Sequence, residues 1–192
     1  MGISPEKHQG VLQAVNWPVV KVVVSIFKAD SDNIDAPPQY LLGNYKPYQD
    51  ESTQHRKFPS DFLLMNENVE DAANRVMRDN YPGVKASLVK LAQAVSREWV
   101  YTPAKLLLLH YIFAYESGIP KLTARCDQFS WLSSDQIQQL PTVGPYVVES
   151  LSLLDTMISD INFDRDEMLV EVDRDNNEIG SISKMVAHRD PS

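Results

Sequence analysis

The chain has 192 residues, of which 43% are hydrophobic and 23% are charged, an ordinary globular composition with enough apolar residues for one substantial core. The formal net charge of -8 argues against strong binding to a nucleic-acid backbone, because that affinity comes from lysine and arginine side chains that neutralise phosphates. The single cysteine, Cys126, excludes an intrachain disulfide framework and a thiolate-rich metal site.

The first ten residues lack the apolar stretch of a secretory signal. No apolar run along the chain reaches the roughly 20 residues that span a bilayer. We therefore expect an intracellular protein, located in the cytoplasm and without membrane attachment.

The first predicted elements are strands. A β-branched run at 19–27 predicts a buried strand, and a second strand is expected at 39–42 after a turn-prone stretch. The polar segment 43–57 contains Pro47 and several charged residues, so we expect a surface loop there.

A helix is predicted to begin after Asn68, whose side chain can cap it while Asp71 reaches back in a capping box. The segment Tyr-Pro-Gly at 81–83 is expected to end this helix. Its apolar residues recur at helical spacing and form one stripe: Val69, Ala72, Ala73, Val76 and Met77.

The second half is expected to repeat the order of strands followed by helices. Strands are predicted at 91–95, 104–115 and 128–131. A capping-box pair, Ser133 and Gln136, starts a brief helix to Leu140. A longer amphipathic helix is predicted at 142–158; its apolar side consists of Val143, Val147, Leu151, Leu154 and Ile158. This order indicates a mixed α/β or α+β sandwich.

The segment 161–192 differs in composition from the rest of the chain. An acidic stretch follows Asp160, and the segments 168–172 and 178–183 alternate like two strands of a hairpin. We expect one domain at 1–160 and an acidic linker with a C-terminal hairpin at 161–192.

One segment carries a motif with fixed spacing. Residues 58–84 read FPSDFLLMNENVEDAANRVMRDNYPGV. This segment resembles the signature box of the Nudix hydrolases: Gly, five residues, Glu, seven residues, Arg-Glu, an aliphatic, any residue, Glu-Glu, any residue, Gly and an aliphatic. With Asp61 at the first place, Glu67 falls on the first glutamate, Arg75 on the arginine and Met77 on the aliphatic position.

Further positions match less strictly. Asp79 takes the first place of the final acidic pair, and Ala72-Ala73 matches a small pair common in this helix. The closing Gly83-Val84 fits after one extra residue. A second motif, WLSSDQIQQL at 131–140, is similar to the tryptophan-containing segment and short helix that commonly follow the last core strand of Nudix domains. The resemblance covers about 19–140 and implies a Nudix-like α/β/α sandwich around a mixed β-sheet.

The box departs from the family pattern at three places. Ser60-Asp61 replaces the opening Gly-Gly, Val76 replaces the glutamate after the arginine, and Asn80 replaces the second glutamate of the acidic pair. Valine cannot bind a cation, and asparagine offers only a neutral carbonyl oxygen. Losing two negative charges weakens the binding of a divalent cation strongly.

The resemblance also implies a chemistry. Nudix enzymes hydrolyse a nucleoside diphosphate linked to another group, and the box glutamates hold Mg²⁺ or Mn²⁺ against the pyrophosphate. In this chain it implies a catalytic set of Glu67, Arg75 and Asp79, in which Glu67 and Asp79 bind the metal weakly and Arg75 orients the carboxylates. Water would attack a phosphorus atom. Asp61 and Glu98 are candidate additional ligands or bases.

The C-terminal segment has a resemblance of its own. Residues 172–180, VDRDNNEIG, followed by His188-Arg189, are similar to the lead-in of isopentenyl-diphosphate-isomerase-like Nudix proteins. In those proteins the lead-in precedes a Nudix core. Two explanations remain open: a truncated tandem protein, or a hairpin that packs on its own domain or on a neighbour.

Several of these residues also have explanations that need no function. Glu67, Asp71, Arg75 and Asp79 lie four apart and could form one solvated face of ion pairs on a helix. No metal-ligand spacing links the four histidines, which are His8, His55, His110 and His188.

Four side chains have simple structural explanations. His110 lies in an apolar run and is expected to be a hydrogen-bonded core residue. Trp99 with Tyr101 could stack on a nucleobase, but aromatic residues beside a strand usually pack in the core. Cys126 has no motif around it and is expected to be a small core thiol or a surface thiol.

The sequence leads to three hypotheses about the function of this protein. The first is a divergent Nudix-superfamily protein that recognises a nucleoside-diphosphate-like or other small diphosphate ligand, with weak or rewired metal-dependent hydrolysis. The second is a non-catalytic Nudix-like module for assembly or regulation, which would involve a homo-oligomer or a protein partner. The third, suggested only by the C-terminal segment, is a diphosphate-handling enzyme with chemistry other than hydrolysis.

Overall fold

The structure is a computed structural model and describes residues 19–29, 36–46, 55–98, 105–166, 168–172 and 178–183. Trp99, Tyr101, His8 and His188, which the sequence singled out, lie outside the described residues. None of the described helices is both long and apolar enough to cross a membrane.

The described strands of the main body form one mixed sheet of seven strands, with the central order β3-β2-β1-β6-β5. β1 and β6 run parallel, and the other neighbours are antiparallel. β4 pairs with β1, and β7 pairs with β2. The strands are β1 (Val19–Lys28), β2 (Gln39–Tyr45), β3 (His55–Lys57), β4 (Ser60–Phe62), β5 (Val84–Glu98), β6 (Lys105–Gly118) and β7 (Cys126–Ser133).

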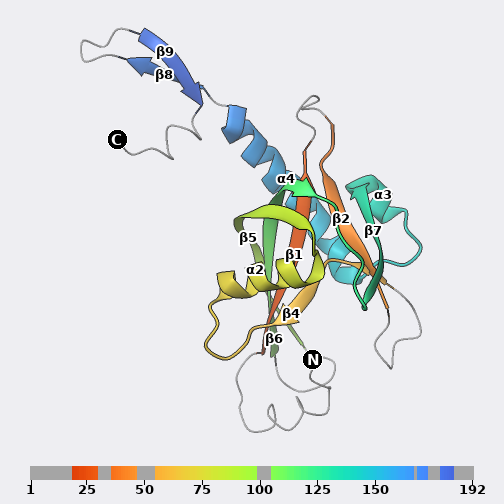
Figure 1. Cartoon of the computed structure of the whole chain (residues 1–192). Coiled ribbons are helices and arrows are strands. Elements are labelled where there is room, and N and C mark those ends of the chain that lie inside the picture. Colours follow the sequence, from red (N-terminus) through yellow and green to blue (C-terminus); the bar gives the residue numbers. More distant parts are fainter. Residues whose placement is uncertain are drawn as a thin grey trace.

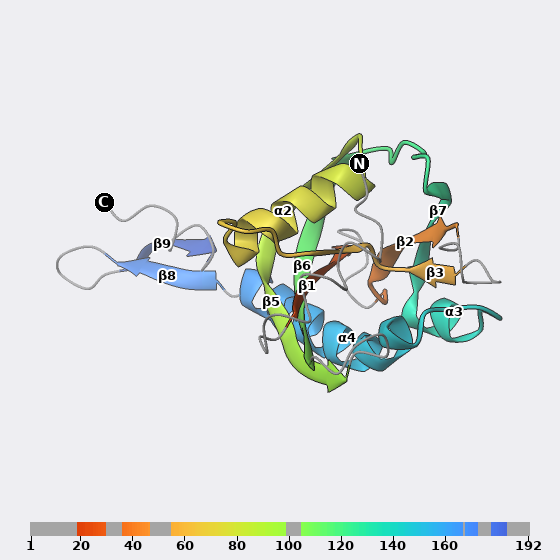
Figure 2. The ribbon, with the colours of Figure 1, turned by 90° about the horizontal axis from the view of Figure 1, so that it is seen from below.

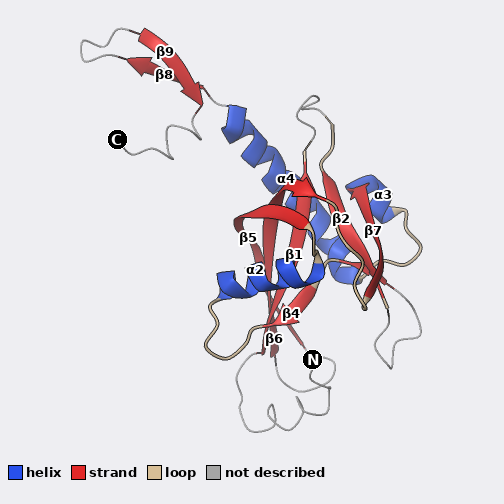
Figure 3. Cartoon of the chain, viewed as in Figure 1, coloured by secondary structure: helices blue, strands red, loops and turns tan. Residues whose placement is uncertain are grey.

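Helices cover both faces of this sheet. α2 (Val69–Asn80) lies on one face, and α3 (Ser134–Gln138) and α4 (Pro145–Asp166) lie on the other, so the sheet is the middle layer of three (Figures 1, 2 and 3). This arrangement confirms the α/β/α sandwich around a mixed sheet that the sequence predicted.

Two cores result, one on each face of the sheet. On one face Val22, Val24 and Ile26 of β1 pack with the apolar stripe of α2. On the other face Val23 and Phe27 pack with the apolar side of α4. Because β1 is buried on both faces, its sequence is rich in β-branched residues and does not alternate between apolar and polar residues.

Helices α2 and α3 both begin at the cap residues that the sequence predicted, but the Asp71 carboxylate of α2 contacts the Asn68 side chain, unlike the backbone contact of a capping box. The Asn68 side chain accepts a hydrogen bond from the Asp71 N–H at 2.8 Å and donates one to the Asp71 carboxylate at 2.6 Å. At α3, Ser133 and Gln136 form the reciprocal capping box. The apolar side predicted for the long helix is buried at Val147, Leu151, Leu154 and Ile158.

Other boundaries differ from the sequence prediction. β2 continues to Tyr45 and β3 occupies 55–57, so both ends of the segment expected to be a surface loop are strands. β5 spans 15 residues, three times the predicted 91–95. Its pairing with β6 shifts register at three places, and these shifts break the period-two pattern on which the prediction depended.

The C-terminal part begins with a longer helix than expected. α4 continues to Asp166, through the start of the stretch expected to be an acidic linker. Beyond it β8 (Met168–Val172) and β9 (Glu178–Ser183) pair antiparallel as a separate two-stranded sheet. Figure 1 shows this hairpin past the end of α4. The division into units at 1–160 and 161–192 stays a prediction.

Candidate functional site

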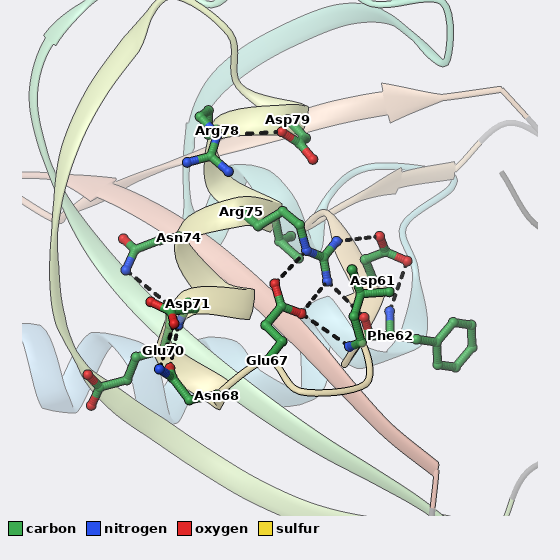
Figure 4. A network of polar contacts seen from close by, with 12 residues as sticks. Asp61, Phe62, Glu67, Asn68, Glu70, Asp71, Asn74, Arg75, Arg78 and Asp79 are labelled. Carbon is green, nitrogen blue, oxygen red and sulfur yellow. Dashed lines mark hydrogen bonds and ion pairs between the residues drawn. The ribbon is translucent and has the colours of Figure 1, made fainter. Parts of the chain in front are cut away.

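Arg75 is the centre of the polar contacts around the box (Figure 4). Its Nε and Nη2 donate to the two carboxylate oxygens of Glu67 at 2.8 and 3.0 Å. Its Nη1 donates to Asp61 at 2.7 Å, and Nη2 also donates to the Phe62 carbonyl at 2.9 Å. We call Arg75, Glu67, Asp61 and the Phe62 carbonyl the Arg75 clamp. It ties α2 to β4 and to the loop between them.

The loop geometry brings Glu67 back towards β4. Asn66 has a positive φ of 66°, a backbone conformation that asparagine tolerates better than most residues. The Glu67 Oε2 atom also accepts a hydrogen bond from the Leu64 N–H at 3.1 Å. Both Glu67 oxygens are therefore occupied within the described residues, and three N–H groups share them.

The clamp is partly shielded from solvent. The side chains of Arg75 and Glu67 are 16% and 14% exposed, whereas Asp61 is 53% exposed. The hydrogen bond from Arg75 lowers the pKa of the Glu67 carboxyl, and the bond to Glu67 raises the pKa of the Arg75 guanidinium. Both groups are charged at neutral pH, so the pair is a charge-assisted, bidentate contact.

Asp79 is not part of the clamp. Its carboxylate is 58% exposed and lies 3.7 Å from the Nε atom of Arg78. Figure 4 shows Asp79 with Arg78 at the end of α2 away from Glu67. The structure thus joins Glu67 with Arg75, as the family pattern implies, but does not bring Asp79 to them.

The two substituted box positions have structural roles in this chain. Val76 is fully buried in the core between α2 and the sheet. The Asn80 side chain donates to the Val76 carbonyl at 2.9 Å. Val76 thus contributes apolar packing. The Asn80 side-chain amide forms a hydrogen bond with the backbone of its own helix.

The alternative of one continuous charged face on α2 is only partly realised. Asp71 pairs with the cap residue Asn68, and Asp79 lies near Arg78. The remaining contact is the Arg75–Glu67 pair, whose glutamate precedes the helix. Glu98 lies at the far end of β5, opposite Lys105 of β6.

The donor set does not fit a divalent metal. Among the described residues there is no group of three or more histidine, cysteine, aspartate or glutamate side chains that could hold an ion. Mg²⁺ and Mn²⁺ prefer several oxygen ligands, and the two oxygens of Glu67 already accept N–H groups. Cation binding by Glu67 would therefore compete with Arg75.

His110 and Cys126 lie in the interior. His110 has no exposed surface, as expected, but neither ring nitrogen has a hydrogen-bond partner among the described residues. The expectation of a hydrogen-bonded histidine is therefore not met there. Its ring lies between Phe58 and Tyr146, with centroid distances of 5.5 and 5.4 Å. Burial lowers the pKa of His110 to about 3 and raises that of the Cys126 thiol.

Asp61 has a larger role than the sequence indicated. The sequence offers it as a candidate ligand or base, with a surface carboxylate as the simpler explanation. In the structure its side chain is 53% exposed, as that explanation expects, and it also pairs with Arg75. β4 positions it by pairing Ser60, Asp61 and Phe62 with β1. A strand of three residues is too short to recognise from its sequence pattern. The only sequence signal for this ion pair was therefore an acidic residue 14 positions before Arg75.

Comparison with known proteins identifies the fold. No protein-family model matches the sequence, and no curated protein matches it. A Nudix hydrolase from Nitrosomonas europaea is similar in structure, with a TM-score of 0.58 and 19% identity over 73% of this chain and 90% of that chain. A MutT protein from Methanosarcina mazei Go1 has a TM-score of 0.59 and 16% identity, over 75% and 98%.

A possible asymmetric diadenosine tetraphosphate hydrolase from Jonesia denitrificans is also similar. It has a TM-score of 0.57 and 16% identity, over 74% of this chain and 97% of that chain. Identities this low establish the fold and nothing finer. The structure of this chain is a Nudix-like fold, as the box spacing predicted.

Proposed function

We propose that this chain is a divergent Nudix-superfamily protein that recognises a nucleoside-diphosphate-like or other diphosphate ligand, and that metal-dependent hydrolysis at its box is weak or rewired. The fold and the register of Glu67 and Arg75 support the superfamily assignment. The ligand class is supported by the diadenosine tetraphosphate named for one structural neighbour. Fold alone does not determine function, so the site has to carry the rest of the proposal.

The observation that carries the weak hydrolysis is the Arg75 clamp. Glu67 is a predicted metal ligand, but its two oxygens accept hydrogen bonds from Arg75 and from the Leu64 N–H. Releasing them to a cation would break a bidentate, partly buried ion pair. Asp79 is the remaining box carboxylate, and it stands outside the clamp. Because Glu67 is held by Arg75 and Asp79 lies outside the clamp, these two predicted metal ligands favour a structural role of the box over metal-assisted hydrolysis.

Hydrolysis and binding assays on the full chain test this proposal. The probes are ADP, UDP-glucose, diadenosine tetraphosphate and inorganic pyrophosphate, each with and without Mg²⁺ or Mn²⁺. Calorimetry measures binding, and product release measures turnover. The variant is Asp79→Asn, and its matched control is Glu70→Gln, another exposed carboxylate of α2 changed to its amide.

We expect binding of at least one diphosphate probe and slow or undetectable turnover. Any Mg²⁺-dependent turnover should fall in Asp79→Asn and persist in Glu70→Gln. Metal-dependent turnover on the order of 10 per second, an ordinary value for enzymes, would contradict weak hydrolysis. If the wild type binds none of the four probes, the proposed ligand class is refuted.

A second candidate is the non-catalytic module for assembly or regulation. Val76 favours it, because the box position that carries a glutamate in the family pattern is fully buried in the core here. This candidate predicts no binding of any diphosphate probe and no turnover, together with self-association or capture of a protein partner. Sedimentation measurements over a range of protein concentrations would detect the self-association.

A further inference from the structure

Lys28, Tyr115 and Trp131 gather where the two parallel strands end. The Lys28 ammonium lies 4.8 Å from the centroid of the Trp131 ring. The Tyr115 and Trp131 rings meet edge to face, with centroids 5.1 Å apart. Lys28 is the last residue of β1, and Tyr115 lies near the end of β6. Because β1 and β6 are parallel, their carboxyl ends lie at the same edge of the sheet.

This group lies on the face of the sheet that α2 covers. Tyr115 and Trp131 pack against the core beneath α2. Lys28 follows Val24 and Ile26, which belong to that core, and side chains two apart on a strand share a face. In open α/β sheets ligands bind outside the carboxyl ends of parallel strands. Position alone therefore makes this group a candidate subsite.

The group is continuous with the end of the box helix. Phe129 lies two residues before Trp131 on β7, and its ring centroid is 5.5 Å from that of Tyr81. Tyr81 is the C-cap residue of α2 and is fully buried, and its hydroxyl donates to the Leu41 carbonyl at 2.8 Å. A ligand on Trp131 would thus lie beside the C-terminal end of the helix that carries the box.

The three side chains of this group are held by contacts but remain partly accessible to solvent. Lys28, Tyr115 and Trp131 are each partly exposed, whereas Phe113, two residues before Tyr115 on β6, is fully buried. The Tyr115 hydroxyl donates to the Gly118 carbonyl at 2.7 Å, which fixes the ring. Trp131 is held by the pairing of its backbone with Leu41 of β2. The flexible component is the lysine side chain.

The chemistry of the group suits one class of ligand. A nucleobase of any kind can stack on an aromatic side chain, since every base has a π-face. A lysine ammonium binds phosphate as a point charge. The chain has a net charge of -8, so a diphosphate needs a local cation to approach it.

We propose that Trp131, Tyr115 and Lys28 form the nucleoside subsite of this protein. The base of a nucleoside diphosphate stacks on the indole face that Lys28 covers, and the displaced ammonium pairs with the phosphates. This inference rests on the proposed function, since it assigns the nucleoside part of the same diphosphate ligand. In this proposal Trp131 and Tyr115 distinguish a nucleoside diphosphate from inorganic pyrophosphate, because only the former carries a base that can stack.

Calorimetry on the full chain with ADP and inorganic pyrophosphate tests the subsite. Trp131→Leu removes the stacking surface, Trp131→Phe keeps a smaller one, and Lys28→Met keeps the length of the side chain without its charge. The matched control is Lys105→Met, an exposed lysine at the opposite end of β6. The change in tryptophan fluorescence on adding ADP, compared between the wild type and Trp131→Phe, reports contact with the indole directly.

We expect Trp131→Leu to weaken ADP binding roughly tenfold or more and to leave pyrophosphate binding unchanged. Trp131→Phe should weaken ADP binding less, and its fluorescence response to ADP should be reduced. Lys28→Met should weaken both probes, and Lys105→Met neither.

Any one of the following results would overturn the subsite. If a folded Trp131→Leu protein binds ADP as tightly as the wild type, the subsite is wrong while the proposed function stands. The same holds if the wild type binds pyrophosphate but not ADP. If the wild type binds neither of these probes, nor UDP-glucose, nor diadenosine tetraphosphate, the subsite and the proposed function fail together. Should Trp131→Leu not fold, Trp131→Phe takes its place, and an unchanged affinity and fluorescence response in that variant would refute the stacking.

Discussion

At the scale of the residue, Arg75 determines which contacts the box carboxylate Glu67 makes. Its guanidinium supplies a planar fork that matches the two oxygens of Glu67, and a third donor reaches Asp61. Sequence spacing predicted that Glu67 and Arg75 belong to one motif. It could not predict Asp61 as a partner, because that contact depends on the pairing of β4 with β1.

Loss of the clamp should be measurable as stability. We expect Arg75→Met to lower the free energy of unfolding by about 2–3 kcal/mol, because a partly buried Glu67 loses its charged partner. Arg75→Lys should recover little of the loss, since an ammonium cannot form the bidentate contact. Urea unfolding measures both changes. Arg78→Met is the matched control, because Arg78 is 72% exposed, and a loss equal to that of Arg75→Met would contradict the account.

Restoring the missing box glutamate should not restore a metal site. Val76 is fully buried in an apolar cluster, so Val76→Glu places a carboxylate where desolvation disfavours its charged form. We expect a loss of about 3 kcal/mol or more in urea unfolding, larger than that of Val76→Ala. Addition of Mg²⁺ should not recover it. Recovery of stability on adding Mg²⁺ would show instead that position 76 can face a bound cation.

His110 should make stability depend on pH. Burial lowers its folded-state pKa from 6.5 to about 3, so between these values the unfolded chain binds the proton that the folded chain excludes. Stability contributed by the neutral ring is complete above about pH 6.5 and falls as pH decreases towards 3, with a slope of at most about 1.4 kcal/mol per pH unit. The difference between wild type and His110→Leu, measured by urea unfolding from about pH 4 to about pH 7, should show this slope. A constant difference across that range would refute it.

At the scale of the element, local signals were predictable, and so was the C-terminal pair of β8 and β9, whereas the pairing within the main sheet was not. The starts of α2 and α3 follow from residues three apart, Asn68 with Asp71 and Ser133 with Gln136, so the chain near each start is sufficient to specify it. β4 depends on β1, a partner far earlier in the sequence, and the full extent of β5 depends on its irregular pairing with β6, the next strand. β4 has three residues, and β5 contains register shifts, so neither leaves a regular pattern.

The cap of α2 gives a prediction with a control in the same helix. Asn68→Ala removes the acceptor for the Asp71 N–H and should cost about 1 kcal/mol in urea unfolding. Asn74→Ala is the same substitution at an exposed interior position of α2 and should be neutral or stabilise by up to about 0.5 kcal/mol, because alanine is the better helix former. Equal losses at the two positions would argue against the cap.

At the scale of the whole molecule, the sequence predicted the layers and their order. Continuous apolar runs indicated strands buried on both faces, and two amphipathic helices supplied the outer layers. The site was predictable only in part, since register placed Glu67 and Arg75 together but said nothing of where the Asp79 carboxylate points. In the structure that carboxylate lies outside the clamp, 3.7 Å from the Nε atom of Arg78.

Our central proposal is that the box serves mainly a structural role in this chain, and Mn²⁺ binding tests it most directly. The paramagnetic resonance signal of free Mn²⁺ can be followed during titration into the wild type, Asp79→Asn and the control Glu70→Gln. We predict dissociation constants on the order of millimolar or weaker for all three proteins. One Mn²⁺ bound per wild-type chain at micromolar concentration, lost in Asp79→Asn and kept in Glu70→Gln, would contradict the account.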